Sequence, residues 1–198
     1  MKHALTFALL LSAAGAYAQL PRNAEDVDPI KVGQTVPDAE ITALDGKKQS
    51  LRTVTEAAPT VLIFYRGGWC PFCNKHLAEV GAVTADLREL GYQVVAVSPD
   101  APSGLQATTD KHDLDYALYS DAPGTLTRAM GLAFAAPERY GAMLGEASGG
   151  KNEGFLPVPA LFLVDTDGTI RFAHVDADYK ERLSSEALMA AAREPAAR

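Results

Sequence analysis

The sequence predicts an α/β protein in which a central mixed β-sheet is flanked by helices and preceded by an N-terminal β-hairpin. The main observation is a pair of apolar, β-branched runs at 60–65 and 93–98, each typical of a strand covered on both faces. A long helical pattern lies between them, so the three segments form a β-α-β unit with an expected right-handed crossover. Strand-turn-strand patterns lie on both sides of this unit, and a helical pattern over 183–193 follows the last of them.

The N-terminal hairpin is predicted within residues 31–51. Two short strand patterns flank Asp45 and Gly46 there, and an Asp-Gly pair is a strong signal for a tight turn between antiparallel strands. The remaining predicted elements are a strand over 116–119, a short helix over 124–130 and a second hairpin over 160–175. The Gly-rich segment 137–154 is long for a connection in a compact domain, which predicts either a lid or a disordered insert.

The helix between the two buried strands is predicted to run from Pro71 to Leu90, a length of about 30 Å. Pro71 suits the first helical turn, where its missing N–H group costs nothing. Gly91 suits the position directly after the helix, which often needs a left-handed backbone. Gly81 lies in the middle of this pattern and is less favourable than Ala there by about 1 kcal/mol.

The first 18 residues have the pattern of a secretory signal peptide. A positively charged start at Lys2 precedes a short apolar stretch, and small residues lead to an Ala-X-Ala pattern that ends at Ala18. The apolar stretch is well short of the roughly 20 residues that span a bilayer, so we expect no stable membrane insertion. Cleavage after Ala18 predicts a periplasmic or secreted protein, with a flexible leader over 19–30 and one domain over 31–198.

The charge balance argues against one class of partner. The chain has 18 Lys and Arg against 25 Asp and Glu, which gives a net charge of −7. A nucleic-acid-binding surface needs clustered basic residues, and the sequence contains no such cluster. We therefore expect no nucleic-acid partner.

The two cysteines of the chain, Cys70 and Cys73, lie at the predicted junction between strand and helix. A helix N-terminus presents unpaired N–H groups and about half a positive charge, which stabilise a thiolate. The Cys-X-X-Cys spacing brings the second sulfur within reach of a disulfide. Because a loop this short gains little stability from a bridge, redox chemistry is favoured over a structural disulfide. Cys70, at an exposed helix end, is the expected nucleophile, and Cys73, one turn further, is the expected buried resolving thiol.

The order of elements, with Trp-Cys-Pro-Phe-Cys at 69–73, resembles the thioredoxin fold. Within that fold, 31–38 resembles the start of a peroxiredoxin-type domain (redoxin, alkyl hydroperoxide reductase/thiol-specific antioxidant), and 64–74 and 157–178 resemble its branch with a Cys-X-X-Cys. The resemblance implies an antioxidant, thiol-dependent oxidoreductase that cycles a Cys70–Cys73 disulfide. It also implies hydroperoxides or protein disulfides as substrates and a thioredoxin-like electron donor.

The motif that surrounds the attacking cysteine of peroxiredoxins is missing here. That family places a Pro and a Thr seven and three residues before this cysteine. Counting back from Cys73 gives Arg66 and Cys70, and counting back from Cys70 gives Ile63 and Gly67. Neither frame matches, and alignment to the family would make Cys73 the attacker, whereas the expected helix-end exposure favours Cys70.

The last strand pair carries a second departure from the family. Pro159 stands where peroxiredoxins have an Arg that polarises the peroxide. Val158 and Pro159 instead resemble the cis-proline loop of thioredoxins, so we expect a cis bond between them and a substrate bound along their backbone. The family resemblance thus indicates peroxide as substrate and the local residues indicate disulfide. The alternatives are a thiol-disulfide oxidoreductase without peroxidase activity and a non-enzymatic binding module with a structural disulfide.

Other side chains near the cysteines have two readings each. Trp69 is expected to pack beside the pair and shield it, although a plain core residue would look the same, and Arg66 either lowers the thiolate pKa or forms a salt bridge. Glu79 and Asp100 either move protons near the thiols or, in the favoured interpretation, belong to the solvated surface. His76 and the two cysteines supply three ligands where zinc sites use four, so no metal and no cofactor is expected.

Overall fold

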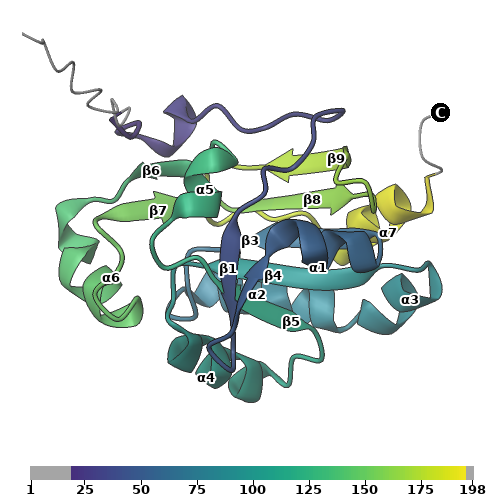
Figure 1. Cartoon of the computed structure of the whole chain (residues 1–198), viewed down its shortest axis with the longest axis horizontal. Helices are drawn as coiled ribbons and strands as arrows, with labels where there is room; N and C mark the ends of the chain where they lie inside the picture. Colours follow the sequence, from purple (N-terminus) through teal and green to yellow (C-terminus); the bar gives the residue numbers. More distant parts are fainter. Residues whose placement is uncertain (1–18, 195–198) are drawn as a thin grey trace, which may run out of the picture.

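The computed structural model describes residues 19–194, so the predicted signal peptide lies outside the described residues. A seven-stranded mixed sheet forms the centre, and helices cover both of its faces (Figure 1). The strands of this sheet are β1 (Glu40–Ala43), β2 (Lys48–Ser50), β3 (Thr60–Phe64), β4 (Gln93–Ser98), β5 (Ala117–Ser120), β8 (Ala160–Val164) and β9 (Ile170–Val175). Their order in space is β2-β1-β5-β4-β3-β8-β9.

The helices and a small second sheet complete the chain. The helices are α1 (Leu51–Ala57), α2 (Pro71–Gly81), α3 (Thr84–Glu89), α4 (Pro102–His112), α5 (Thr125–Ala129), α6 (Gly141–Ala147) and α7 (Ser185–Arg193), with 3₁₀ turns η1 (Ala24–Asp26) and η2 (Glu138–Tyr140). β6 (Ala133–Ala135) and β7 (Phe155–Pro157) pair with each other. This pair and α6 lie together at the left of Figure 1. No helix within 19–194 is long and apolar enough to cross a bilayer.

The predicted β-α-β unit is present, because β3 and β4 pair in parallel with a helix between them. Alternating residues of β3 point to opposite faces of the sheet. Val61 and Ile63 join a core cluster under α2, α3, α4 and α7, whereas Leu62 and Phe64 join a second cluster under α1 and α5. Burial on both faces explains why the strand is apolar after Thr60. Both predicted hairpins are also present, as β1–β2 and β8–β9.

The predicted helix from Pro71 to Leu90 is broken. α2 ends at Gly81, and α3 starts at Thr84 after Val83, whose backbone is not helical (φ −116°, ψ 9°). The Thr84 hydroxyl lies 2.9 Å from the Gly81 carbonyl and 2.9 Å from a carboxylate oxygen of Asp115, so a tertiary contact stabilises the break where helix propensity is lowest.

Two segments predicted to be loose are packed. Within the leader, the Pro21 carbonyl accepts from the Ala135 N–H at 2.8 Å, and the Ile30 N–H donates to the Met130 carbonyl at 3.0 Å. Residues 137–154 form η2 and α6 rather than a disordered insert. Asn152 anchors the end of that segment, since its side-chain amide donates to the Phe155 carbonyl at 3.0 Å.

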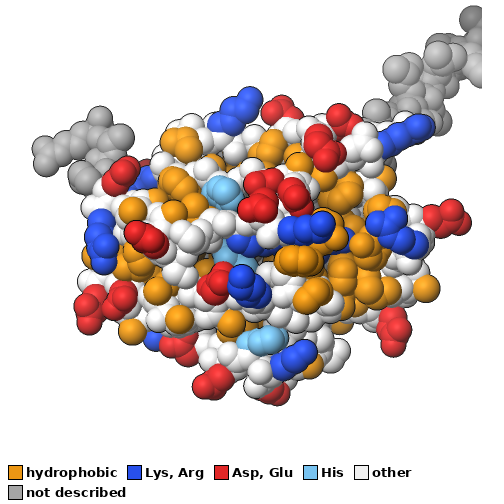
Figure 2. All heavy atoms as spheres, turned by 180° about the vertical axis from the view of Figure 1, so that it is seen from behind, with side chains coloured by type: hydrophobic (Ala, Val, Ile, Leu, Met, Phe, Trp, Pro, Cys, Tyr) orange, Lys and Arg blue, Asp and Glu red, His pale blue; other side chains and the backbone are white. Residues whose placement is uncertain are grey.

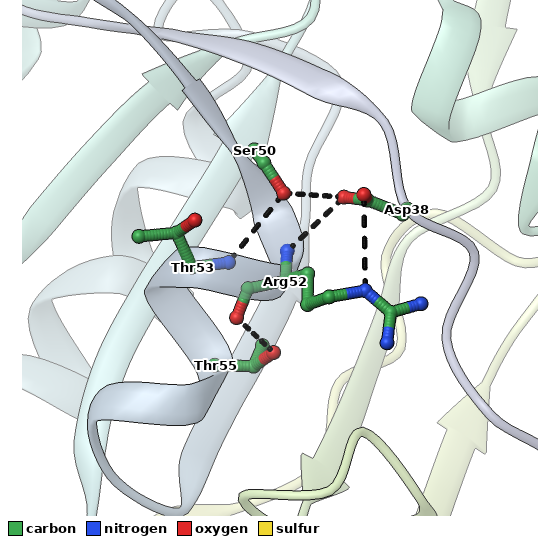
Figure 3. Close-up of polar contacts among 5 residues, drawn as sticks. All are labelled: Asp38, Ser50, Arg52, Thr53 and Thr55. Carbon is green, nitrogen blue, oxygen red and sulfur yellow. Dashed lines mark hydrogen bonds and ion pairs between the residues drawn. The ribbon is translucent and has the colours of Figure 1, made fainter.

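α1, which the sequence pattern did not predict, follows the N-terminal hairpin without a loop. Ser50 caps this helix by accepting from the Thr53 N–H at 3.5 Å, and its hydroxyl donates to Asp38 at 2.5 Å (Figure 3). Asp38 also accepts from the Arg52 N–H at 3.3 Å and lies 3.8 Å from the Arg52 Nε. The segment before β1 thus ties the hairpin to the helix.

Candidate redox-active site

The site is built where the chain leaves β3 and enters α2. Cys70 is the capping residue of α2, with extended backbone (φ −90°, ψ 114°), and Pro71 occupies the first turn as predicted. Gly67 has a φ of +142°, and a Cβ at this position would collide with the Trp69 indole. Glycine therefore lets Trp69 fold back and pack against the core cluster that contains both cysteines, as expected of a shielding residue.

Both sulfurs are reduced and both are buried. Cys73 is fully buried as expected, but the predicted exposure of Cys70 is wrong, because only 1% of this residue is exposed. The C-terminal part of the chain contacts this end of α2, because the Phe72 ring packs edge-on against the Tyr179 ring, with centroids 5.6 Å apart. Tyr179 lies between β9 and α7.

The pKa values of the two thiols diverge. A hydrogen bond from the Cys73 thiol is the main cause that lowers the pKa of Cys70 to about 6, with help from the N–H groups of Cys73 and Phe72 and from the charge of Arg66. The same hydrogen bond, together with burial and repulsion by Cys70, raises the pKa of Cys73 well above its usual value. Cys70 therefore ionises first and Cys73 stays a thiol.

Arg66 is a buried cation in an aromatic surrounding. Only 4% of it is exposed, and its guanidinium carbon lies 5.1 Å from the Trp69 ring centroid, 5.2 Å from that of Tyr140 and 4.3 Å from that of Tyr179. No salt bridge to Arg66 forms among the described residues, and its Nε has no hydrogen-bond partner there. Of its two readings, the structure supports the lowering of the Cys70 pKa.

A second arginine at the site escaped the sequence analysis. The Arg182 Nη2 lies 3.5 Å from the Cys73 Sγ, and the charge of Arg182 favours the Cys73 thiolate. Arg182 precedes α7, and 109 positions separate it from Cys73 in the chain. Its neighbours Lys180 and Glu181 are charged as well, so the segment reads as an ordinary solvated loop and carries no motif.

Asp100 is buried, contrary to its interpretation as solvated surface. It follows β4, and its carboxylate accepts from the Gly68 N–H at 2.7 Å, which ties the loop before Cys70 to the neighbouring strand. Burial raises the pKa of Asp100 to about 6. Glu79 does lie at the surface, 3.6 Å from Lys75.

His76 lies on the buried face of α2. Burial is the main cause that lowers the pKa of His76 to about 4, and the charge of Arg182 adds to it, so the imidazole is neutral at pH 7. Among residues 19–194, no group of three or more His, Cys, Asp or Glu side chains is placed to hold a metal ion.

The predicted cis bond before Pro159 is wrong, because every peptide bond within the described residues is trans. The Val158 side chain is fully buried, and its N–H donates to the Leu132 carbonyl at 2.8 Å. This bond extends the β6–β7 pairing by one residue, which keeps the chain extended up to Pro159. The donor that a thioredoxin-type substrate would use is therefore occupied, while Pro159 lines a cavity next to Arg66.

Comparison with known proteins identifies the family of the chain. The profile of the AhpC/TSA family matches residues 32–173. Peroxiredoxin bcp1 of Schizosaccharomyces pombe is 28% identical over 124 residues, which cover 62% of this chain and 64% of that protein. The thiol-disulfide oxidoreductase ResA of Bacillus cereus is 21% identical over 163 residues, which cover 82% of this chain and 80% of that protein. The chain thus spans somewhat less than two thirds of the first of these relatives.

Solved structures agree on the fold. Peroxidoxin BcpB of Mycobacterium tuberculosis superposes with a TM-score of 0.66 at 22% identity, covering 83% of this chain and 97% of that one. Reduced Prx3 of Vibrio vulnificus, solved in complex with hydrogen peroxide, gives a TM-score of 0.71 at 19% identity, covering 83% and 99%. The thioredoxin-like architecture predicted from the sequence is confirmed. With its family profile matched over most of its length and with relatives named as peroxiredoxins and thiol-disulfide oxidoreductases, the chain belongs to the AhpC/TSA family of thiol-dependent oxidoreductases.

Proposed function

We propose that this protein is an exported thiol peroxidase that reduces small hydroperoxides through Cys70 and Cys73, with electrons from a thioredoxin-like donor. The observation that carries the proposal is the pair of unequal thiols. Cys70 has a pKa of about 6, and Cys73 stays protonated beside it. One sulfur is thus a nucleophile at neutral pH and the other is held ready to resolve the product.

The reaction balances with these two groups alone. The Cys70 thiolate attacks the terminal oxygen of ROOH, the O–O bond breaks, and Cys70 becomes a sulfenic acid while the alkoxide takes up a proton to form ROH. The Cys73 thiol then condenses with the sulfenic acid, which releases water and forms the Cys70–Cys73 disulfide. A donor dithiol reduces this bridge by thiol–disulfide exchange and becomes oxidised itself.

A small hydroperoxide fits this site better than a protein disulfide does. An extended protein substrate needs a free backbone donor near the site, and the Val158 N–H is already bonded to Leu132. This contact favours the peroxide reading over the disulfide reading. The missing Pro and Thr of peroxiredoxins leave Arg66 and Arg182 as the cations beside the sulfurs.

Peroxide consumption with a regenerating thioredoxin system tests the proposal. We expect turnover by the wild type, none above background by Cys70→Ser, and a single turnover by Cys73→Ser that leaves a sulfenic acid which dimedone traps. Insulin reduction, measured in parallel, should be slow. Fast insulin reduction without peroxide consumption would reject the peroxidase and leave the thiol-disulfide oxidoreductase, an activity named for the ResA relative.

Redox titration separates both enzymes from a binding module with a static bridge. A catalytic pair should have a potential between about −270 and −120 mV, and a structural disulfide one below about −300 mV. Export rests on the pattern of the first 18 residues. Expression of the full chain should give a periplasmic protein whose mass corresponds to a start at Gln19, and recovery of the uncleaved chain in the cytoplasm would contradict it.

A further inference from the structure

We infer that the cavity beside Arg66 is a binding site for a small apolar carboxylate, such as an organic acid with a short chain or a single ring. This cavity, called the Arg66 cavity below, has a volume of about 170 Å³. It lies between the β6–β7 pair, the segment that leads into α6 and the segment that follows β9. Its lining includes Arg66, Phe134, Tyr140, Leu156, Pro159 and Tyr179.

The charge in this cavity calls for an anion. Arg66 is 4% exposed, forms no salt bridge among the described residues and has an Nε without an acceptor. The second charged residue of the lining is Arg139, and none of the lining residues is acidic, although the chain as a whole carries a net charge of −7. Apart from the Cys70 thiolate, whose pKa it lowers, Arg66 has no anionic partner among the described residues, and stacking on aromatic rings offsets the cost of its burial in part.

The phenol of Tyr140, which lines the cavity, already responds to this cation. A contact with Arg66 is the main cause that lowers the pKa of the Tyr140 phenol, and the charge of Arg139 adds to it. The field at this point therefore favours an oxyanion. A carboxylate can accept two parallel hydrogen bonds from a guanidinium, which a neutral phenol cannot.

The rest of the cavity lining favours a ligand whose remaining part is apolar. Apart from the two arginines and the two tyrosines, the lining consists of apolar side chains from β6, β7, η1 and the loops next to them. Sites for drug-sized ligands span roughly 300–1,000 Å³, so the volume of this cavity suits a smaller molecule. On the face drawn in Figure 2, hydrophobic side chains gather on the right, the side of β6, β7 and α6, with basic side chains beside them.

Occupancy of the Arg66 cavity should be felt at the nucleophile. The positive charge of Arg66 is one of the causes that lower the pKa of Cys70. A carboxylate bound to Arg66 would offset that charge, so a filled cavity makes Cys70 a weaker acid. The inference does not depend on peroxidase activity, because binding can be measured without a redox cycle.

The experiment uses hexanoate and its neutral analogue hexanamide as probes. Binding to the reduced protein and to the Cys70→Ser/Cys73→Ser double variant is measured by calorimetry. We expect hexanoate to bind both proteins about tenfold or more tightly than hexanamide, since hydrogen bonds to charged groups contribute most. Saturating hexanoate should also raise the pKa of Cys70, followed by thiolate absorbance in the wild type.

Three variants locate the site. Arg66→Met should abolish the preference for hexanoate over hexanamide, and Ala177→Phe should fill the cavity and abolish binding of both. Arg128→Met is the matched control, because Arg128 stacks on the Phe155 ring at 5.2 Å but lies outside the cavity. Equal affinity for acid and amide, no binding of hexanoate, or undiminished binding by Ala177→Phe would each overturn the inference. These three outcomes are measured without the Arg66→Met protein, so they remain decisive even where that variant does not fold.

Discussion

The low pKa of Cys70 is the property on which the proposed chemistry depends, and substitutions can separate its physical causes. With a pKa of about 6, about 90% of Cys70 is ionised at pH 7, against about 3% of an ordinary cysteine. The causes also have an order. The hydrogen bond from Cys73 lowers the pKa more than the charge of Arg66 does. Cys73→Ala should therefore raise the Cys70 pKa more than Arg66→Met does.

The assay is a pH titration of thiolate absorbance in the reduced protein, with the Cys70→Ser curve subtracted. Absorbance is preferable to alkylation rates here, because a reagent must first reach a sulfur that is 1% exposed. Arg128→Met, which removes a stacked arginine away from the site, should leave the curve unchanged. A wild-type midpoint near that of a free thiol, or a larger shift for Arg66→Met than for Cys73→Ala, would refute this account.

Three further perturbations follow from the structure. Asp100→Asn should flatten the pH dependence of the free energy of unfolding. Because the pKa of Asp100 is raised in the folded state, its contribution to stability is complete below about pH 4 and is lost as the pH rises through about 6. Chemical denaturation at several pH values will detect this loss in the wild type. Arg182→Met should slow disulfide formation after a peroxide pulse but leave formation of the sulfenic acid intact, because the charge of Arg182 favours the thiolate of Cys73. Rapid-quench mass analysis separates these two steps. Equal slowing of both would contradict a role of Arg182 in the second step. Leu77→Ala should lower the free energy of unfolding by roughly 2–5 kcal/mol, since the side chain is fully buried under the sheet; urea unfolding measures it, and a loss below 1 kcal/mol would argue against that packing.

Local sequence predicted the elements whose residue types are set by their own burial or backbone conformation. Residues 61–64 of β3 and 94–97 of β4 are apolar because both faces of the sheet are covered, and this pattern is visible without a structure. The Asp45-Gly46 turn and the left-handed Gly91, with φ +86°, were equally readable, because only a few residue types suit these conformations. The helix break after Gly81 could not be read from the local sequence, since it is stabilised by the contact of Thr84 with the distant Asp115.

The candidate site divides in the same way. The cysteine pair and its position at a helix end are local properties, so the sequence revealed them. The burial of Cys70 was missed, because tertiary packing around the helix end sets it and the local pattern does not contain that packing. Arg182 was missed for the same reason, and the Val158–Pro159 prediction failed because pairing with Leu132 keeps that segment extended. Long-range packing governs each of these outcomes, and no local pattern encodes it.

Trp69 has a practical consequence. It is the single tryptophan of the chain, it packs against the cluster that contains both sulfurs, and its ring lies 5.7 Å from that of Tyr140. Its emission is therefore a built-in optical reporter for this corner of the molecule. Stopped-flow fluorescence could follow oxidation, reduction and ligand entry in real time on the unlabelled wild-type protein.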